Sequence, residues 1–116
     1  MNQTAHIPHI RKLLCDLEFL RRANGARNPR FIKISGGKFQ ENGLPDLMIC
    51  FKKVTFWLEL KRDWNDEPTL IQKYNISDLS ENSNFIAGFV VDDEFKFAWD
   101  DETPIKLIEL IKKEMM

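Results

Sequence analysis

Two acidic residues and one lysine in the middle of the chain have the types and the spacing for chemistry on a phosphate group. Asp46 and Glu59 lie in two apolar segments, 46–51 and 54–61, which are separated by only two lysines. A two-residue turn at those lysines predicts an antiparallel hairpin, and counting back from the turn places Asp46 directly opposite Glu59. Because side chains alternate along a strand, Lys61 then shares a face with Glu59. A lysine pair is not a favoured turn, so a longer loop with a shifted register is an alternative.

The opposed carboxylates of this hairpin would repel each other, and a divalent cation between them would turn the repulsion into attraction. Carboxylate oxygens are hard ligands that suit Mg²⁺, which usually takes one or two of them and keeps water for the rest. Such an ion polarises a phosphate and lowers the pKa of a bound water. Lys61 could orient that water or stabilise charge on the phosphate. The simpler interpretation is a solvated salt-bridge cluster in which Lys61 neutralises the two acids.

Other elements must support this hairpin, because one of its faces is wholly apolar. That face carries Leu47, Ile49, Phe51, Val54, Phe56, Leu58 and Leu60, and we expect it in the core. Apolar spacing and turn residues predict helices at about 8–22, at 68–81 and from 103–104, and further strands at 31–34, 85–91 and 95–99. The helix at 68–81 has a partial apolar stripe of Ile71, Tyr74 and Leu79. The order α-β-β-β-α-β-β-α predicts an α/β domain with a mixed sheet flanked by helices.

The composition is typical of a single soluble domain. The chain has 116 residues and is 43% hydrophobic, so residues 1–116 can form one core without a metal or disulfides. Cys15 and Cys50 are the only cysteines and lie among apolar residues, which predicts buried free thiols in a reducing cytoplasm. A zinc site is not expected without CxxC pairs. No apolar run has the length of a signal peptide or a membrane span, so we expect a cytoplasmic protein.

Charge is distributed unevenly along the chain, although the formal net charge is only −1. Residues 1–40 contain eight lysines and arginines and two acids, a surplus of +6, so the remaining residues carry −7. An asymmetry of this size predicts one basic face, which could bind nucleic acid. A chance scatter of solvated charges is the alternative.

The order of several short motifs gives the hairpin a family resemblance. Gly43-Leu44-Pro45-Asp46 is followed by twelve positions and then by Glu59-Leu60-Lys61. This resembles the PD-(D/E)xK nuclease superfamily, whose motif is Pro-Asp, a hairpin and then Glu-x-Lys. Lys33-Ile34-Ser35-Gly36-Gly37 upstream and Gln72 downstream make the chain similar to the VRR-NUC branch of that superfamily. The resemblance covers roughly residues 31–91 and implies a restriction-endonuclease-like fold.

The resemblance also implies a role for each residue of the motif. Asp46 and Glu59 would bind Mg²⁺, for which Mn²⁺ can substitute, and the backbone carbonyl of Leu60 would complete the protein ligands. Lys61 would take the role of the catalytic lysine. Gln72 would support the site or contact phosphate.

Two further parts of the resemblance concern the first forty residues. The family often has another acid on the first helix, and Glu18 is the only glutamate there. Its position is not a clean match, so Glu18 is either a further metal ligand or a solvated helix acid. The residues implied to lie near the DNA backbone are Arg30, Lys33, Ser35, Gly36, Gly37 and Lys38, although ordinary turn chemistry also explains this segment.

The activity implied by the resemblance is that of a Mg²⁺-dependent DNA endonuclease, which hydrolyses phosphodiester bonds and leaves a 5′-phosphate. Short standalone members of this branch, often phage-encoded, resemble Holliday-junction resolvases. That implies branched or four-way DNA as the substrate and a homodimer, because two symmetric cuts need two sites. The alternatives are a non-catalytic DNA-binding module on the same fold and an unrelated α/β protein-interaction domain. The presence of all three motif residues favours the enzyme, because a degenerate module would be expected to have lost at least one.

Overall fold

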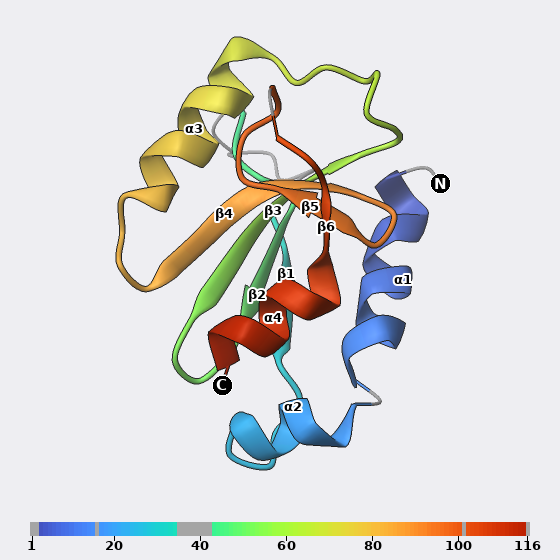
Figure 1. Cartoon of the computed structure of the whole chain (residues 1–116), viewed down its shortest axis with the longest axis vertical. Coiled ribbons are helices and arrows are strands. Elements are labelled where there is room, and N and C mark those ends of the chain that lie inside the picture. The colour runs from blue at the N-terminus through green and yellow to red at the C-terminus, as the bar shows by residue number, and fades with distance from the viewer. Residues whose placement is uncertain (1–2, 16, 35–42, 101, 116) are drawn as a thin grey trace.

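One mixed sheet with helices on both faces forms the body of the molecule (Figure 1). The computed structural model describes residues 3–15, 17–34, 43–100 and 102–115, and within them four helices and six strands are formed. In chain order these are α1 (Gln3–Cys15), α2 (Glu18–Ala23), β1 (Arg30–Lys33), β2 (Leu47–Cys50), β3 (Thr55–Lys61), α3 (Leu70–Ser80), β4 (Phe85–Val91), β5 (Glu94–Lys96), β6 (Ile105–Lys106) and α4 (Leu107–Met115). The chain is therefore a mixed α/β fold, as predicted.

The strands lie in the sheet in the order in which they occur in the sequence, from β1 to β6. All neighbouring strands are antiparallel except β3 and β4, which run parallel. A parallel pair needs a crossover connection, and α3 provides it. The carboxyl ends of β3 and β4 consequently lie at the same end of the sheet.

The β2–β3 hairpin has the register expected from a two-residue turn. Cys50 pairs with Thr55 and Ile49 pairs with Phe56. The backbone N–H of Phe51 donates to the carbonyl of Val54 at 2.9 Å, which closes the turn around the two lysines. The longer loop with a shifted register is not formed, although a lysine pair is an unusual turn.

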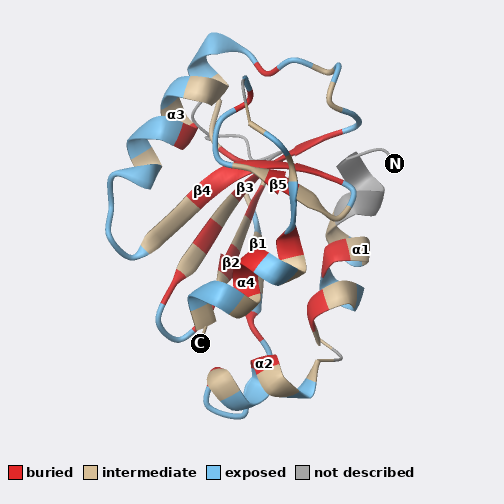
Figure 2. Cartoon of the chain, in the orientation of Figure 1, coloured by how far each residue is buried: buried red, intermediate tan, exposed pale blue. Residues whose placement is uncertain are grey.

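The main hydrophobic core lies between the sheet and the helices α1, α2 and α4. The seven apolar residues expected on one face of the hairpin are all buried in it, which confirms that part of the sequence analysis. The helices contribute Ile10, Leu14, Leu20, Leu107, Leu110 and Ile111. Figure 2 shows buried residues concentrated on the central strands and on parts of α1 and α4. We call this side of the sheet the α1 face.

The opposite side of the sheet, which we call the α3 face, is covered over β3 and β4 by α3. A smaller cluster lies there, with Ile76 of α3, Ala87 and Phe89 of β4, and Trp99 as its buried members. Trp57 of β3 and Trp64 pack against it. Aromatic residues therefore make up a larger share of this cluster than of the core on the α1 face.

The first helix differs from its prediction. The expected helix at 8–22 is two helices, because Leu17 has an extended backbone, with φ −95° and ψ 105°, directly before α2. The first of them also begins at Gln3, so that Pro8 lies inside α1 instead of in its first turn. The prediction was wrong here because Leu17 and Leu20 continue the same apolar spacing across the break.

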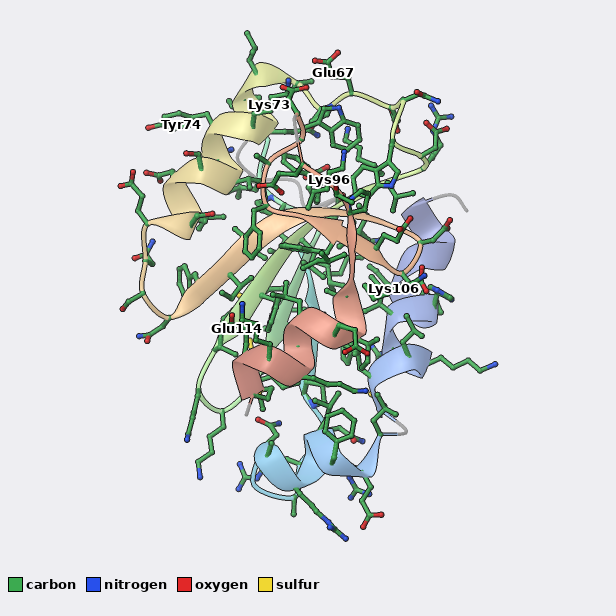
Figure 3. All side chains as sticks on the ribbon, in the orientation of Figure 1. Glu67, Lys73, Tyr74, Lys96, Lys106 and Glu114 are labelled. Atoms are coloured by element: carbon green, nitrogen blue, oxygen red, sulfur yellow. The ribbon has the colours of Figure 1, made fainter. Side chains whose placement is uncertain are left out.

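Three other expectations also need correction. The last helix begins at Leu107, not at 103–104, because Ile105 pairs with Phe95 to form β6. The short strand expected at 95–99 is Glu94–Lys96. Of the apolar stripe expected on the helix at 68–81, Leu79 packs against the cluster on the α3 face, but Ile71 is exposed, and Tyr74 is 67% exposed and points away from the body of the molecule (Figure 3).

The strand β4 and the start of α3 lie where the sequence predicts them. The strand at 85–91 is confirmed residue for residue, and α3 begins directly after Thr69. Cys15 and Cys50 are free of disulfides but half-buried, so they are more accessible than expected. Among the described helices, none combines the length and the apolar character that crossing a membrane requires.

Candidate active site

Two charged side chains are buried at the carboxyl end of β3. Glu59 is 1% exposed and Lys61 is 6% exposed, and the strand alternation places both on the α3 face. Charged residues are rarely buried to this degree unless they are paired or hydrogen-bonded. The simpler interpretation, a solvated salt-bridge cluster, does not describe this burial.

Asp46 is brought against this strand end by the turn that precedes β2. Its backbone carbonyl accepts a hydrogen bond from Ile34 at 2.8 Å, and its Oδ2 accepts one from the backbone N–H of Leu60 at 3.0 Å. The carboxylate is thus fixed to the residue that follows Glu59, and the two carboxyl groups lie close enough for a hydrogen bond between them. The register argument therefore placed these two acids correctly.

Gly43 allows the turn before Asp46 to pass close to α3. Its φ of +78° lies in the left-handed region, which favours glycine. A Cβ at this position would come within 2.8 Å of the Cγ2 atom of Ile71. Any other residue would therefore strain the backbone and collide with the helix that covers the site.

Gln72 joins the two buried charges of β3. Its Nε2 donates to Oε1 of Glu59 at 3.1 Å, while its Oε1 accepts from Nζ of Lys61 at 3.1 Å. An amide suits this position because it offers a donor to the acid and an acceptor to the ammonium group. The ordered set of Asp46, Glu59, Lys61 and Gln72 is brought together by β2, β3 and α3.

Gln72 is itself held by the amino end of α3. Thr69 is the N-cap of that helix, and its hydroxyl accepts from the backbone N–H of Gln72 at 3.2 Å. In return, Oε1 of Gln72 accepts from the backbone N–H of Thr69 at 2.9 Å, which completes a capping box. The sequence analysis did not include Thr69 in the site, although the Thr-x-x-Gln pattern at a helix start is a recognisable signal for it.

The electrostatics of the site are dominated by Glu59. The pKa of its carboxyl is raised from 4.5 to about 9, chiefly by burial and then by the negative charge and the hydrogen bond of Asp46. The positive charge of Lys61 opposes this shift and is the weaker influence. With this pKa the carboxyl of Glu59 is protonated at neutral pH, because the charge of Lys61 does not offset burial and the charge of Asp46.

The donor atoms of this site fit a divalent cation with a preference for oxygen. Two carboxyl groups meet there, and a cation would replace the proton that Glu59 retains. The described residues contain no group of three or more histidine, cysteine, aspartate or glutamate side chains suited to a metal. Two carboxylates with water are nevertheless a usual protein contribution to a Mg²⁺ site.

Glu18 is not brought to this site. It begins α2, which lies at the opposite end of the molecule from the amino end of α3 (Figure 1). Its carboxylate pairs with Arg22 at 3.1 Å, and the side chain is 76% exposed. The structure thus places Glu18 as a solvated helix acid.

The residues expected to contact DNA are distributed over both faces of the sheet. Lys33 is exposed at the site end of β1, but its pairing with Leu47 places it on the α1 face. Arg30 is exposed at the other end of β1 and pairs with Cys50, which places it on the α3 face. Ser35, Gly36, Gly37 and Lys38 lie outside the described residues.

Comparisons of the chain with protein-family models, with curated proteins and with solved structures find no match.

Proposed function

We propose that this chain is a Mg²⁺-dependent endonuclease that hydrolyses phosphodiester bonds of DNA. The observation that carries the proposal is the meeting of Asp46, Glu59 and Lys61 at one strand end, where Gln72 hydrogen-bonds to both charges of β3. The resemblance to the VRR-NUC branch of the PD-(D/E)xK nucleases supports the proposal, since it names these four residues from the sequence. We also propose that the sheet is of the restriction-endonuclease-like type.

The carboxylates of Asp46 and Glu59 would hold the metal ion, with the backbone carbonyl of Leu60 as a third ligand. When bound there, Mg²⁺ or Mn²⁺ would supply Lewis acidity toward a phosphate oxygen and would lower the pKa of a water molecule. The hydrogen bond from the Leu60 N–H orients the carboxylate of Asp46, so this ligand is positioned before any ion arrives. Gln72 does the same for Glu59 through its Nε2.

Lys61 is suited to a direct role in the reaction because its ammonium group is buried and its direction is fixed. Among the described residues its ammonium group donates one hydrogen bond, to Oε1 of Gln72, which leaves two of its three donors for a substrate. Those donors can stabilise negative charge that develops on a phosphate oxygen or orient the attacking water. Fixed donors in a site screened from bulk water are more effective than mobile ones on the surface.

Hydrolysis would add water across the bond between phosphorus and the 3′-oxygen, which leaves a 5′-phosphate and a 3′-hydroxyl. We propose branched DNA, such as a four-way junction, as the substrate class, in keeping with the resemblance to junction resolvases. Two symmetric cuts require two active sites, so the active form would be a homodimer. Light scattering of the purified protein tests the dimer separately from the activity.

The test of the activity is cleavage of a labelled four-way junction beside linear duplex and single-stranded DNA, with Mg²⁺, Mn²⁺ or EDTA. The wild type is compared with Lys61→Ala and with Lys113→Ala, which removes an exposed lysine from α4. Metal-dependent cutting that is lost only in Lys61→Ala supports the proposal. Paired symmetric cuts in the junction support the substrate class as well.

Other outcomes of this test separate the parts of the proposal. Metal-dependent cutting of duplex DNA in preference to the junction keeps the enzyme and overturns the substrate class. Absence of cutting with either metal overturns the enzyme. Retained DNA binding would then favour the alternative, a non-catalytic DNA-binding module on the same fold.

A further inference from the structure

A cavity of about 410 Å³ lies at the end of the molecule opposite to the candidate active site. Three cationic side chains line it, from Arg27 in the segment before β1, Arg30 at the start of β1 and Lys52 in the turn between β2 and β3. The other lining residues include no acidic side chain. A concave surface with this lining favours an anion.

These three cations differ from five other surface cations that are neutralised by a neighbouring acid. Arg22, Arg62, Lys73, Lys106 and Lys112 each form an ion pair with a nearby acid. Within the described part of the chain, no acid forms an ion pair with the side chains that line the cavity. Their charges thus converge on the cavity without internal neutralisation.

The cavity is held together by Asn24, a polar residue that is buried at the end of α2. Its Oδ1 accepts from the backbone N–H of Lys52, and its Nδ2 donates to the carbonyl of Arg27 at 3.0 Å. The walls of the cavity come from two separate chain segments, and this one side chain ties them together. Phe51, which is nearly fully buried, also lines the cavity. The backbone of the two walls is therefore held in place, and the exposed side chains of Arg27, Arg30 and Lys52 project from it.

The cavity lies at the end of the sheet and reaches the α3 face, on which the candidate active site lies, through Cys50 and Arg30. Thr55 alternates onto the α3 face with Glu59 and Lys61, and it pairs with Cys50, which in turn pairs with Arg30. Cys50 and Arg30 both line the cavity. The six steps along β3 from Thr55 to Lys61 span about 20 Å at about 3.3 Å per residue.

The sheet between the two sites is partly accessible. Ile32 of β1 and Met48 of β2 lie on the α3 face between the cavity and Asp46, and both are only half-buried. The helix α3 packs on β3 and β4 and leaves β1 and β2 to the side. An extended molecule could therefore lie along β1 and β2 and reach both ends.

We propose that this basic cavity binds a backbone phosphate of the substrate DNA, about six base pairs away from the phosphate that is cut. The spacing follows from about 20 Å along the strand and about 3.4 Å of helix axis per base pair. The inference rests on the proposed nuclease function for the identity of the polyanion. It gives the enzyme a minimum substrate length that the active site alone would not impose.

The test measures binding of labelled duplexes of 6, 12 and 24 base pairs in EDTA over a range of salt concentrations. The variant Arg27→Ala/Lys52→Ala is compared with Lys12→Ala/Lys113→Ala, which removes the same charge from exposed positions of α1 and α4. For the two longer duplexes, we expect the magnitude of the slope of log K against log salt to decrease by about 1 in the cavity variant, because the loss of one phosphate contact removes about 0.9. The control variant and the shortest duplex should show little change. Circular dichroism confirms that each variant is folded.

Equal slopes for the two double variants on long duplexes would overturn the cavity as a DNA contact. Titration with inorganic phosphate distinguishes the source of the anion. Tight binding of free phosphate that is lost in Arg27→Ala/Lys52→Ala, without any effect on DNA, would assign the cavity to a small anion and overturn the proposal. Because metal is absent, a chain that binds DNA through the cavity but never cuts it would overturn the nuclease and not the cavity. Conversely, a protein that cuts DNA but shows equal salt slopes for the two double variants would overturn the cavity and not the nuclease.

Discussion

Near its carboxyl end, β3 is buried on both faces, and yet the two faces have opposite chemistry. On the α1 face, Leu60 is 1% exposed and lies in an aliphatic core. On the α3 face its neighbour Glu59 is also 1% exposed, but it lies between Asp46 and Gln72. Burial of Leu60 removes apolar surface from water and stabilises the fold. Burial of Glu59 removes an ionisable group from water and costs stability.

This contrast shows where the protein departs from the pattern of a stable fold, in which apolar residues are buried and acids are exposed. The apolar face follows the expected alternation at every position, from Leu47 to Leu60. The opposite face places a buried acid beside a second acid, which is unfavourable unless something else binds there. Departures of this kind are expected at functional sites, where stability is sacrificed for a ligand.

The largest effect is expected from Glu59→Gln, which keeps the shape of the protonated side chain and removes its charge. An amide can accept from Gln72 and donate toward Asp46 as the protonated carboxyl does, so the fold should be retained. Loss of a charged metal ligand should reduce DNA cleavage in Mg²⁺ by about a thousandfold, or about 4 kcal/mol of transition-state stabilisation. Single-turnover cleavage measures the loss, and the matched control is Glu81→Gln at the exposed end of α3. Cleavage by Glu59→Gln at the wild-type rate would contradict the role of Glu59.

Truncation of a side chain on the other face of the strand should lower stability and leave the rate of DNA cleavage unchanged. Leu58 is fully buried in the main core, next in sequence to Glu59. Leu58→Ala should lower the free energy of unfolding by about 3 kcal/mol, because it removes buried apolar surface and leaves a cavity. Urea denaturation measures the loss. The cleavage rate per folded molecule should remain near that of the wild type. A selective loss of cleavage in a stable Leu58→Ala protein would contradict the assignment of the chemistry to the α3 face and of stability to the α1 face.

The pH dependence of the free energy of unfolding should show that the burial of Glu59 on the α3 face costs stability. The pKa of Glu59 is about 9 in the folded state and near 4.5 when the chain is unfolded. Between these values the folded protein holds a proton that the unfolded chain releases, so stability is lost as the pH rises. The slope approaches about 1.4 kcal/mol per pH unit for one group. Urea denaturation in EDTA at pH 6, 7 and 8 should show this slope in the wild type and a flatter one in Glu59→Gln. Parallel slopes would show that Glu59 does not keep its proton.

The hairpin and β4 could be predicted from the sequence because their signals are local. Strict alternation and a turn of two residues specify the register, and a one-residue slip would have exposed every core residue of the hairpin. The break before α2 could not be predicted, because Leu17 and Leu20 keep the helical spacing across it. The strand β6 consists of only two residues, and it forms only because Ile105 finds Phe95 as a partner.

The same distinction applies to the candidate site. Opposition of Asp46 and Glu59 follows from the register of the hairpin, so the amino-acid sequence alone is enough to predict it. The burial of Lys61 and its hydrogen bond to Gln72 depend on where α3 lies over the sheet, which no local pattern gives. The position of Glu18 depends in the same way on the path of the chain after α1. Long-range placement is thus the part that sequence reasoning could not supply.

The smallest effect is expected from Thr69→Ala, which tests how far the chemistry of the α3 face depends on the stability of the helix that covers it. The hydroxyl of Thr69 caps the helix at Gln72, while the reciprocal bond from the Thr69 backbone to Gln72 does not need the side chain. Loss of the cap should lower the free energy of unfolding by about 1 kcal/mol. It should reduce cleavage by less than about tenfold, below the range for residues that directly support a metal ligand. Thr69→Ser should restore both quantities, and Thr103→Ala, at an exposed loop position, should change neither. If Thr69→Ala instead matched Glu59→Gln in its loss of cleavage, the cap would be as necessary as the acid, and the site would depend on the exact position of α3 as much as on its charges.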